Sequence, residues 1–213
     1  MADPDLPIDI SPPVSPALAV WPGDTSVSRE VLLDMGRGDH LTLSTLTTTV
    51  HVGAHVDAPS HYGRTAPSVD QVPLARCLGP CLVVAVEAVR GTRLGPDVAD
   101  VPTGTERLLL RTGTYPDPEH FAEDFAALSP ELVHRLADRG VRLIGIDTPS
   151  VDLFSSKELP AHRACLARDM IILEGLVLDH VEPGPWELLA LPLKLEGFDA
   201  SPVRAVLRRL RSP

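Results

Sequence analysis

The chain has 213 residues, a formal net charge of −10 and three cysteines, which is the size of one globular domain. Its 44% of hydrophobic residues supply enough apolar material for a core, so the composition excludes wholesale disorder. The acidic balance disfavours a nucleic-acid partner, because phosphate binding needs clustered Lys and Arg, and the one such run lies at 204–211.

Membrane and secretory segments are not predicted. No apolar stretch approaches the ~20 residues of a membrane span, and the first ten residues carry acids where a signal peptide needs positive charge. We therefore expect a cytoplasmic protein with no membrane partner. Cys77, Cys81 and Cys165 are odd in number and form no CxxC pair, so buried thiols are expected rather than disulfides or a thiolate zinc site.

The 22 prolines predict many turns, short strands and few long helices. Residues 9–25 are too rich in proline for a helix and should run extended into a turn at 22–24. Residues 41–52 nearly alternate Thr, Leu and Val, a pattern that predicts a strand. Short apolar runs bounded by Gly, Pro or Asp predict further buried strands at 81–89, 107–112, 141–147 and 186–193.

Two helices are expected. The clearer one covers 129–139, with Ser129 as the N-cap and Gly140 as the stop. A weaker one covers about 156–168, is interrupted near a proline, and places His162 on a loop or in a first turn.

The tail from residue 201 fits either a helix or a strand, because a Ser-Pro start precedes alternating apolar residues. There is no internal repeat and no polar linker in the sequence. Several strands with few helices therefore indicate one mixed α/β domain over residues 1–213.

Residues 51–61 read HVGAHVDAPSH and bring three histidines and an aspartate together. His51, His55 and Asp57 offer two imidazoles and a carboxylate, which suits zinc or another divalent first-row metal. At a strand end these positions share one face, and Gly53 allows a bend that aims them at one point. Each histidine taken alone is more simply a surface residue, but together with Asp57 they predict a metal site.

Other common catalytic motifs are absent from the sequence. Without HExxH, a helix-borne metalloprotease site is not supported. The sequence also lacks the GxSxG elbow, the GxxxxGK[ST] loop and the GxGxxG turn, so serine nucleophiles and nucleotide binding lose their usual support.

The HxGxHxDxPxH pattern resembles the signature of the cyclase-like metal-dependent hydrolases, and within them that of the bacterial kynurenine formamidases, or arylformamidases. The resemblance implies a single α/β domain of the swivelling β/β/α type and a homodimer. It extends over nearly the whole chain, through WPGDT at 21–25, GIDTPSVD at 145–152, KELPAH at 157–162, ILEGLVLD at 172–179 and LPLKLEGFDASPVRAVL at 191–207.

The resemblance implies a binuclear site with two Zn²⁺ per subunit and Asp57 bridging them. It implies that His51, His55 and Asp57 hold the first ion, and that Asp57, His162 and Glu174 hold the second. One feature of the sequence supports Glu174, because this residue interrupts an apolar run at 170–178, where an unpaired buried carboxylate would be costly.

The implied activity is hydrolysis of N-formyl-L-kynurenine to L-kynurenine and formate, in tryptophan degradation by the kynurenine pathway. A metal-bridged hydroxide would attack the formyl carbon, and His61, itself unligated, would shuttle the proton. Trp21 would line the substrate pocket, although an isolated Trp is as often a core anchor. Tyr62, Ser150 and Asp152 are candidates for the amino acid end of the substrate.

Two other functions stay open at this point. One is a related metal-dependent hydrolase acting on a cyclic amide such as isatin. The other is a non-catalytic metal-binding protein that keeps the same scaffold.

Overall fold

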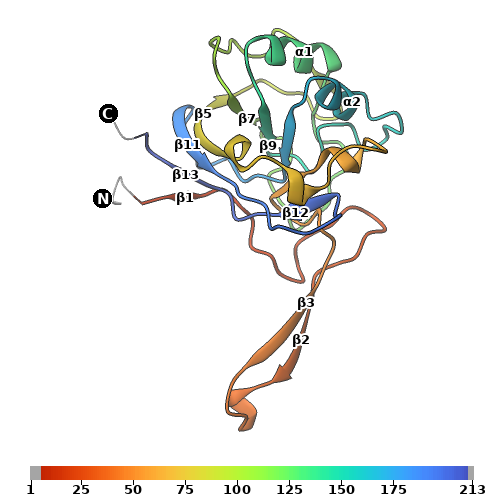
Figure 1. Ribbon diagram of the computed structural model, residues 1–213, viewed down its shortest axis with the longest axis vertical. Coiled ribbons are helices and arrows are strands. Elements are labelled where there is room, and N and C mark those ends of the chain that lie inside the picture. Colours follow the sequence, from red (N-terminus) through yellow and green to blue (C-terminus); the bar gives the residue numbers. More distant parts are fainter. Residues whose placement is uncertain (1–5, 211–213) are drawn as a thin grey trace.

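A computed structural model describes residues 6–210 of the chain (Figure 1). A nine-stranded mixed sheet forms the body of the molecule. Its strands lie in the order β1 (Ile8–Asp9), β13 (Val206–Arg208), β11 (Gly184–Leu189), β5 (Leu78–Ala85), β7 (Arg107–Arg111), β9 (Leu143–Ile146), β10 (Ile171–Glu174), β4 (His55–Asp57) and β12 (Ala200–Pro202).

The centre of the sheet is parallel and its two flanks are antiparallel. Strands β5, β7, β9 and β10 run parallel to one another, while β11 and β4 pair antiparallel to the outer members of this group. Helices α1 (Pro130–Asp138) and α2 (Pro160–Ala167) join β7 to β9 and β9 to β10, and they pack together on one side of the sheet (Figure 1). This arrangement confirms the expected single α/β domain with short strands and few helices.

Alternation along the central strands divides the core into two layers. Leu108 and Leu110 of β7 pack with the buried side of α1, whereas Leu109 belongs to the apolar cluster on the other side of the sheet. Successive side chains on a strand point to opposite faces, so a run such as RLLLR serves both layers at once.

The first expected helix is confirmed, and the second is shorter than expected. The Ser129 hydroxyl accepts a hydrogen bond from the backbone N–H of Leu132 at 3.1 Å, and the chain leaves α1 through Gly140 at φ 106°. Helix α2 begins only at Pro160, because Leu159 adopts a left-handed conformation at φ 45°. His162 therefore lies in the first turn of α2, where its side chain is buried.

The strand expected at 41–52 is only partly present. Strand β3 (Leu43–Thr47) pairs with β2 (Ser28–Leu33) in a hairpin that projects from the body (Figure 1). His51 lies in a turn beyond this hairpin, so the expectation that His51 continues the strand is wrong. Gly53, at φ 54°, turns the chain before β4 begins at His55.

The remaining elements are short. The four other strands expected from apolar runs are present. The tail from residue 201 could have been a helix or a strand, and it forms β12 and β13. No helix in residues 6–210 is long and apolar enough to cross a membrane. Shorter pieces complete the described chain: β6 (Arg93–Leu94), β8 (Ala127–Leu128), and the 3₁₀ turns Met35–Arg37, Pro59–His61, Val69–Gln71 and Leu74–Arg76.

The three cysteines are buried and unpaired, as expected from the sequence. Burial raises the pKa of the Cys77 thiol to about 11 and that of Cys81 to about 12. Such thiols stay protonated near neutral pH, so they serve as core residues rather than as nucleophiles.

Candidate metal centre

Strand β4 places two of the expected metal ligands in the middle of a three-stranded group. It lies between β10 and β12, and its register sets His55 opposite Glu174 of β10. His55 and Asp57 are two residues apart on one strand, so their side chains point to the same side of the sheet. Directly opposed residues of antiparallel strands share a face, which adds Glu174 to this pair.

A close backbone approach fixes this register. Gly175 follows Glu174 with φ 66°, and a Cβ added there would lie 2.1 Å from the carbonyl oxygen of Gly53. That carbonyl also lies 2.8 Å from Nδ1 of His55. Because glycine has no Cβ, the end of β10 can lie against the turn that orients His55.

Asp57 lies at the centre of the site and has no exposed surface. Its carboxylate oxygens lie 3.1 Å from Nδ1 of His51, 3.4 Å from Nε2 of His55 and 3.6 Å from Nε2 of His162. None of these contacts has hydrogen-bond geometry, and both Asp57 oxygens and Nε2 of His55 lack a hydrogen-bond partner. Orphaned buried polar atoms are costly, and a divalent cation would coordinate all three. The residues therefore fit a metal centre.

The donor atoms fall into two overlapping groups. Within the described chain, donor atoms lie within 4.8 Å of one another in the set His51, Asp57 and His61 and in the set His55, Asp57 and Glu174. Asp57 belongs to both sets, but His55 is grouped with Glu174 rather than with His51, so the sets differ from the expected division of the ligands. His162 is in neither set, but its Nε2 lies 3.7 Å from Oε1 of Glu174. The five expected ligands thus meet in one place, and His61, which was expected to be unligated, has a donor atom within 4.8 Å of those of His51 and Asp57.

His162 and Glu174 are held in place by contacts with Asp152 and with the backbone of Val151. Nδ1 of His162 lies 2.9 Å from Oδ2 of Asp152, and Asp152 also accepts a hydrogen bond from Nη1 of Arg93 at 2.7 Å. The backbone N–H of Val151 donates to Oε1 of Glu174 at 2.6 Å. A carboxylate behind a ligating histidine fixes its tautomer and orientation. Asp152 is therefore a support for His162.

In the protein without metal, the buried histidines and carboxylates shift one another's pKa values. Burial alone would lower the pKa of His55, but contacts with Asp57 and Glu174 raise it to about 10. Burial likewise opposes the charged form of His162, while Asp152 and Asp57 raise its pKa to about 10. Burial would raise the pKa of Asp57, yet contacts with the histidines hold it well below the usual range. The carboxylates thus favour the protonated form of these imidazoles, which a bound metal would have to displace.

Asp199 also lies at the site, although no motif in the sequence pointed to it. It precedes β12, and its Oδ2 lies 3.0 Å from Nε2 of His51 and 3.2 Å from Nδ1 of His61. A lone aspartate far along the chain from 51–61 carries no spacing signal. Its role emerges only when the sheet places β12 beside β4.

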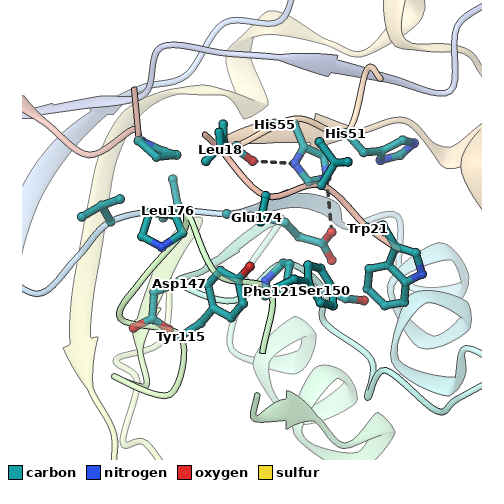
Figure 2. Close-up of a pocket in the computed structure, with 18 of the residues that line it drawn as sticks. Leu18, Trp21, His51, His55, Tyr115, Phe121, Asp147, Ser150, Glu174 and Leu176 are labelled. Atoms are coloured by element: carbon teal, nitrogen blue, oxygen red, sulfur yellow. Dashed lines mark hydrogen bonds and ion pairs between the residues drawn. The ribbon is translucent and has the colours of Figure 1, made fainter. Parts of the chain in front are cut away.

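A cavity of about 530 Å³ opens onto the histidines and Glu174. Tyr115 and Phe121 lie across it from His51 and His55, and Trp21 lies at one end (Figure 2). The Trp21 ring packs against Phe121 and Phe154, with centroids 5.4 and 5.1 Å apart, so it is both a wall residue and part of an aromatic cluster.

Of the three candidates for the amino acid end of a substrate, one lines this cavity. Ser150 is part of the wall, whereas Tyr62 and Asp152 are not among the described lining residues. Tyr62 packs instead against the apolar cluster beneath the helices. Tyr115 and Phe121 were missed because isolated aromatic residues in an irregular segment give no periodic pattern.

The sequence matches a known family over most of its length. A family model described as "Putative cyclase" matches residues 8–153. The chain belongs to this cyclase family. Residues 8–153 of this chain contain four of the six clustered donor residues, His51, His55, Asp57 and His61.

Solved structures share the fold of this cyclase-family protein. One, described as a "potential metal-dependent hydrolase with cyclase activity", is 26% identical, with 95% of this chain and 96% of that chain covered and a TM-score of 0.82. Another, a "predicted metal-dependent hydrolase" from Bacillus stearothermophilus, is also 26% identical, with 95% and 97% covered and a TM-score of 0.80. Isatin hydrolase A from Labrenzia aggregata is 23% identical, with 95% and 93% covered and a TM-score of 0.81, a likeness of fold.

Proposed function

We propose that this protein is a metal-dependent arylformamidase that hydrolyses N-formyl-L-kynurenine to L-kynurenine and formate. The observation that carries the proposal is the buried Asp57 carboxylate, which lacks a hydrogen bond and is surrounded by imidazoles beside a cavity with aromatic walls. Polar donors that converge at one side of a largely apolar cavity are typical of enzyme sites. Relatives described as metal-dependent hydrolases support the hydrolase class.

The donor set would hold two Zn²⁺ ions. When bound, such ions polarise a carbonyl and make water more acidic. On the family resemblance, we assign His51, His55 and Asp57 to one ion, and Asp57, His162 and Glu174 to the other, although the donor distances group His55 with Glu174. The same nitrogen and oxygen donors also accept Mn²⁺, Co²⁺ or Fe²⁺.

The protein's own residues position the substrate and move its protons. Trp21, Tyr115 and Phe121 offer aromatic faces and edges for the aryl ring, which would place the formyl group towards the histidines. His61 would take a proton from the attacking water and return it to the aniline nitrogen. The water oxygen would bond to the formyl carbon, the C–N bond would break, and formate and the free aniline would be released.

A substrate panel tests this assignment. N-formyl-L-kynurenine, formanilide and isatin are each offered to the zinc-loaded protein, and formate or ring-opened product is measured. We expect N-formyl-L-kynurenine to give the highest kcat/KM. Turnover of isatin alone would replace the proposal with cyclic-amide hydrolysis. Zinc binding without turnover of any of the three would leave a metal-binding protein.

We also propose that the protein is a homodimer in which the β2–β3 hairpin contacts a second copy. An isolated two-stranded hairpin is at best marginally stable in water, and this one projects from the body (Figure 1). The hairpin exposes the large apolar side chains of Leu32, Met35, Leu41, Leu43 and Leu46, which a second copy would cover.

A cytoplasmic location remains a prediction.

A further inference from the structure

We infer that Asp199 is a positioning residue that sets the tautomers of two histidines at once, one expected to bind metal and one expected to carry protons. The inference rests on the proposed function for the role of His61. It adds a residue that neither the motif at 51–61 nor the spacing of the expected ligands indicates. The observation behind it is a single carboxylate oxygen shared by two imidazoles.

Only one nitrogen of each imidazole ring contacts Asp199. Oδ2 of Asp199 lies 3.0 Å from Nε2 of His51 and 3.2 Å from Nδ1 of His61. The His51 and His61 rings lie close together, with centroids 4.3 Å apart. A carboxylate only accepts hydrogen bonds when ionised, so both nitrogens must donate.

Those donations decide which ring nitrogens keep a lone pair. With hydrogen on Nε2, His51 presents the lone pair of Nδ1, the atom 3.1 Å from Asp57, and can use it to bind metal. With hydrogen on Nδ1, His61 keeps the lone pair on Nε2, where it can accept a proton from water. A single carboxylate oxygen thus favours both the tautomer in which His51 can bind metal and the tautomer in which His61 can act as a base.

The backbone at Asp199 and in the two residues before it is anchored by hydrogen bonds. The N–H of Ala58 donates to the Asp199 carbonyl at 2.8 Å, and the N–H of Val69 donates to the Phe198 carbonyl at 2.9 Å. Asp70 accepts from the N–H of Gly197 at 3.2 Å. The side chain of Asp199 is itself 46% exposed, so it is held by its backbone rather than by burial. An anchored carboxylate can impose an orientation on its partners.

Nitrogen NMR of the neutral imidazoles tests the tautomers without any turnover. Zinc-loaded wild-type protein should carry hydrogen on Nδ1 of His61, and Asp199→Ala should shift His61 towards the Nε2–H form that predominates in free imidazoles. Asp70→Asn is the control, because it disturbs the same loop without touching either histidine. An Nε2–H tautomer in the wild type, or the same shift in Asp70→Asn, would overturn the inference.

Zinc competition and kinetics separate the two effects of Asp199. Asp199→Ala should weaken zinc binding about tenfold through His51, in the range for lost outer carboxylates, and His61→Ala should not reproduce that loss. At saturating zinc, kcat for formanilide should fall in Asp199→Ala, and the double variant with His61→Ala should lose little more than His61→Ala alone. Full recovery of kcat at saturating zinc, or additive losses, would contradict the proton-carrier part. Because the NMR and zinc measurements need no substrate, failure of the formamidase assignment is distinguishable from failure of this inference.

Discussion

His55 and Glu174 are cross-strand partners, and Nε2 of His55 lies 3.3 Å from Oε2 of Glu174. The two residues are far apart in the sequence, yet antiparallel pairing of β4 with β10 places them side by side at the edge of the cavity. Neither strand supplies a complete donor set alone. The metal centre therefore depends on the register between these strands.

Replacing Asp57 should remove metal binding more completely than replacing any other donor. Asp57→Asn keeps the shape but removes the charge that contacts His51, His55 and His162. We expect loss of both metal ions by elemental analysis and loss of formamidase activity. Asp124→Asn, at an exposed ion pair with Arg90, is the control and should keep both. Retention of about two ions per chain in Asp57→Asn would refute the bridging assignment.

Gly175→Ala tests the backbone contact that sets the register. The new Cβ would meet the Gly53 carbonyl, and φ 66° is itself unfavourable for alanine. Gly91→Ala is the matched control, since Gly91 has φ 73° with nothing within 4 Å.

We expect Gly91→Ala to lower the free energy of unfolding by about 1 kcal/mol for the backbone strain. Gly175→Ala should cost a further ~1–3 kcal/mol, as overpacking does, and should weaken zinc binding. Denaturant unfolding of the metal-free variants provides the comparison. Equal losses for the two variants would show that the contact with Gly53 does not constrain the site.

Zinc binding should release protons and strengthen with rising pH. The pKa values of His55 and His162 are raised from 6.5 to about 10 in the protein without metal, so between these values a metal must displace protons. The same histidines stabilise the metal-free fold fully below pH 6.5, and this contribution is lost as the pH rises through about 10. Calorimetry of zinc binding in buffers of different protonation enthalpy counts the protons. A binding enthalpy that is the same in every buffer would contradict this ionisation scheme.

Trp21→Ala should weaken the use of aromatic substrates. Trp21 lines the cavity beside Phe121, and an aromatic pair contributes about 0.5–1.5 kcal/mol beyond area burial. We expect kcat/KM for formanilide to fall roughly 3–10-fold, mainly through KM. An N-alkyl formamide is the matched control, because it has no aromatic ring that could contact Trp21. Equal losses for both substrates would place Trp21 in the structural core alone.

The hairpin should hold the proposed dimer together. Leu43→Ser and Leu46→Ser replace side chains that are 48% and 62% exposed on β3, so they should leave the monomer fold intact. We expect light scattering to show a dimer for the wild type and a monomer for the double variant. Leu74→Ser, at a leucine on the body that is 56% exposed, serves as control. A double variant that stays dimeric would exclude the hairpin as the contact.

Local patterns predicted the short-range parts of the structure. Ser129 and Gly140 mark the ends of α1 because caps and left-handed stops act within a few residues. His55 and Asp57 share a face of β4 for the same local reason. His51 was misplaced because Gly53 turns the chain, and a glycine permits such a turn without specifying it.

Long-range pairing decided what local patterns could not. Asp199 and Tyr115 have no motif around them, and they reach the centre and the cavity only because distant segments become neighbours in the fold. The assignment of His162 and Glu174 came from resemblance to a family. Their convergence on Asp57 depends on the pairing of β10 with β4 and on the position of α2.

The most direct test of the account is a zinc titration of chelated wild-type protein, with formate release from N-formyl-L-kynurenine measured at each step. We predict no release from the metal-free protein and full activity at about two zinc ions per chain, as expected for a two-metal site. Formate release that persists after complete chelation would contradict the metal-dependent mechanism. Binding of about two ions with no release would contradict the assigned substrate.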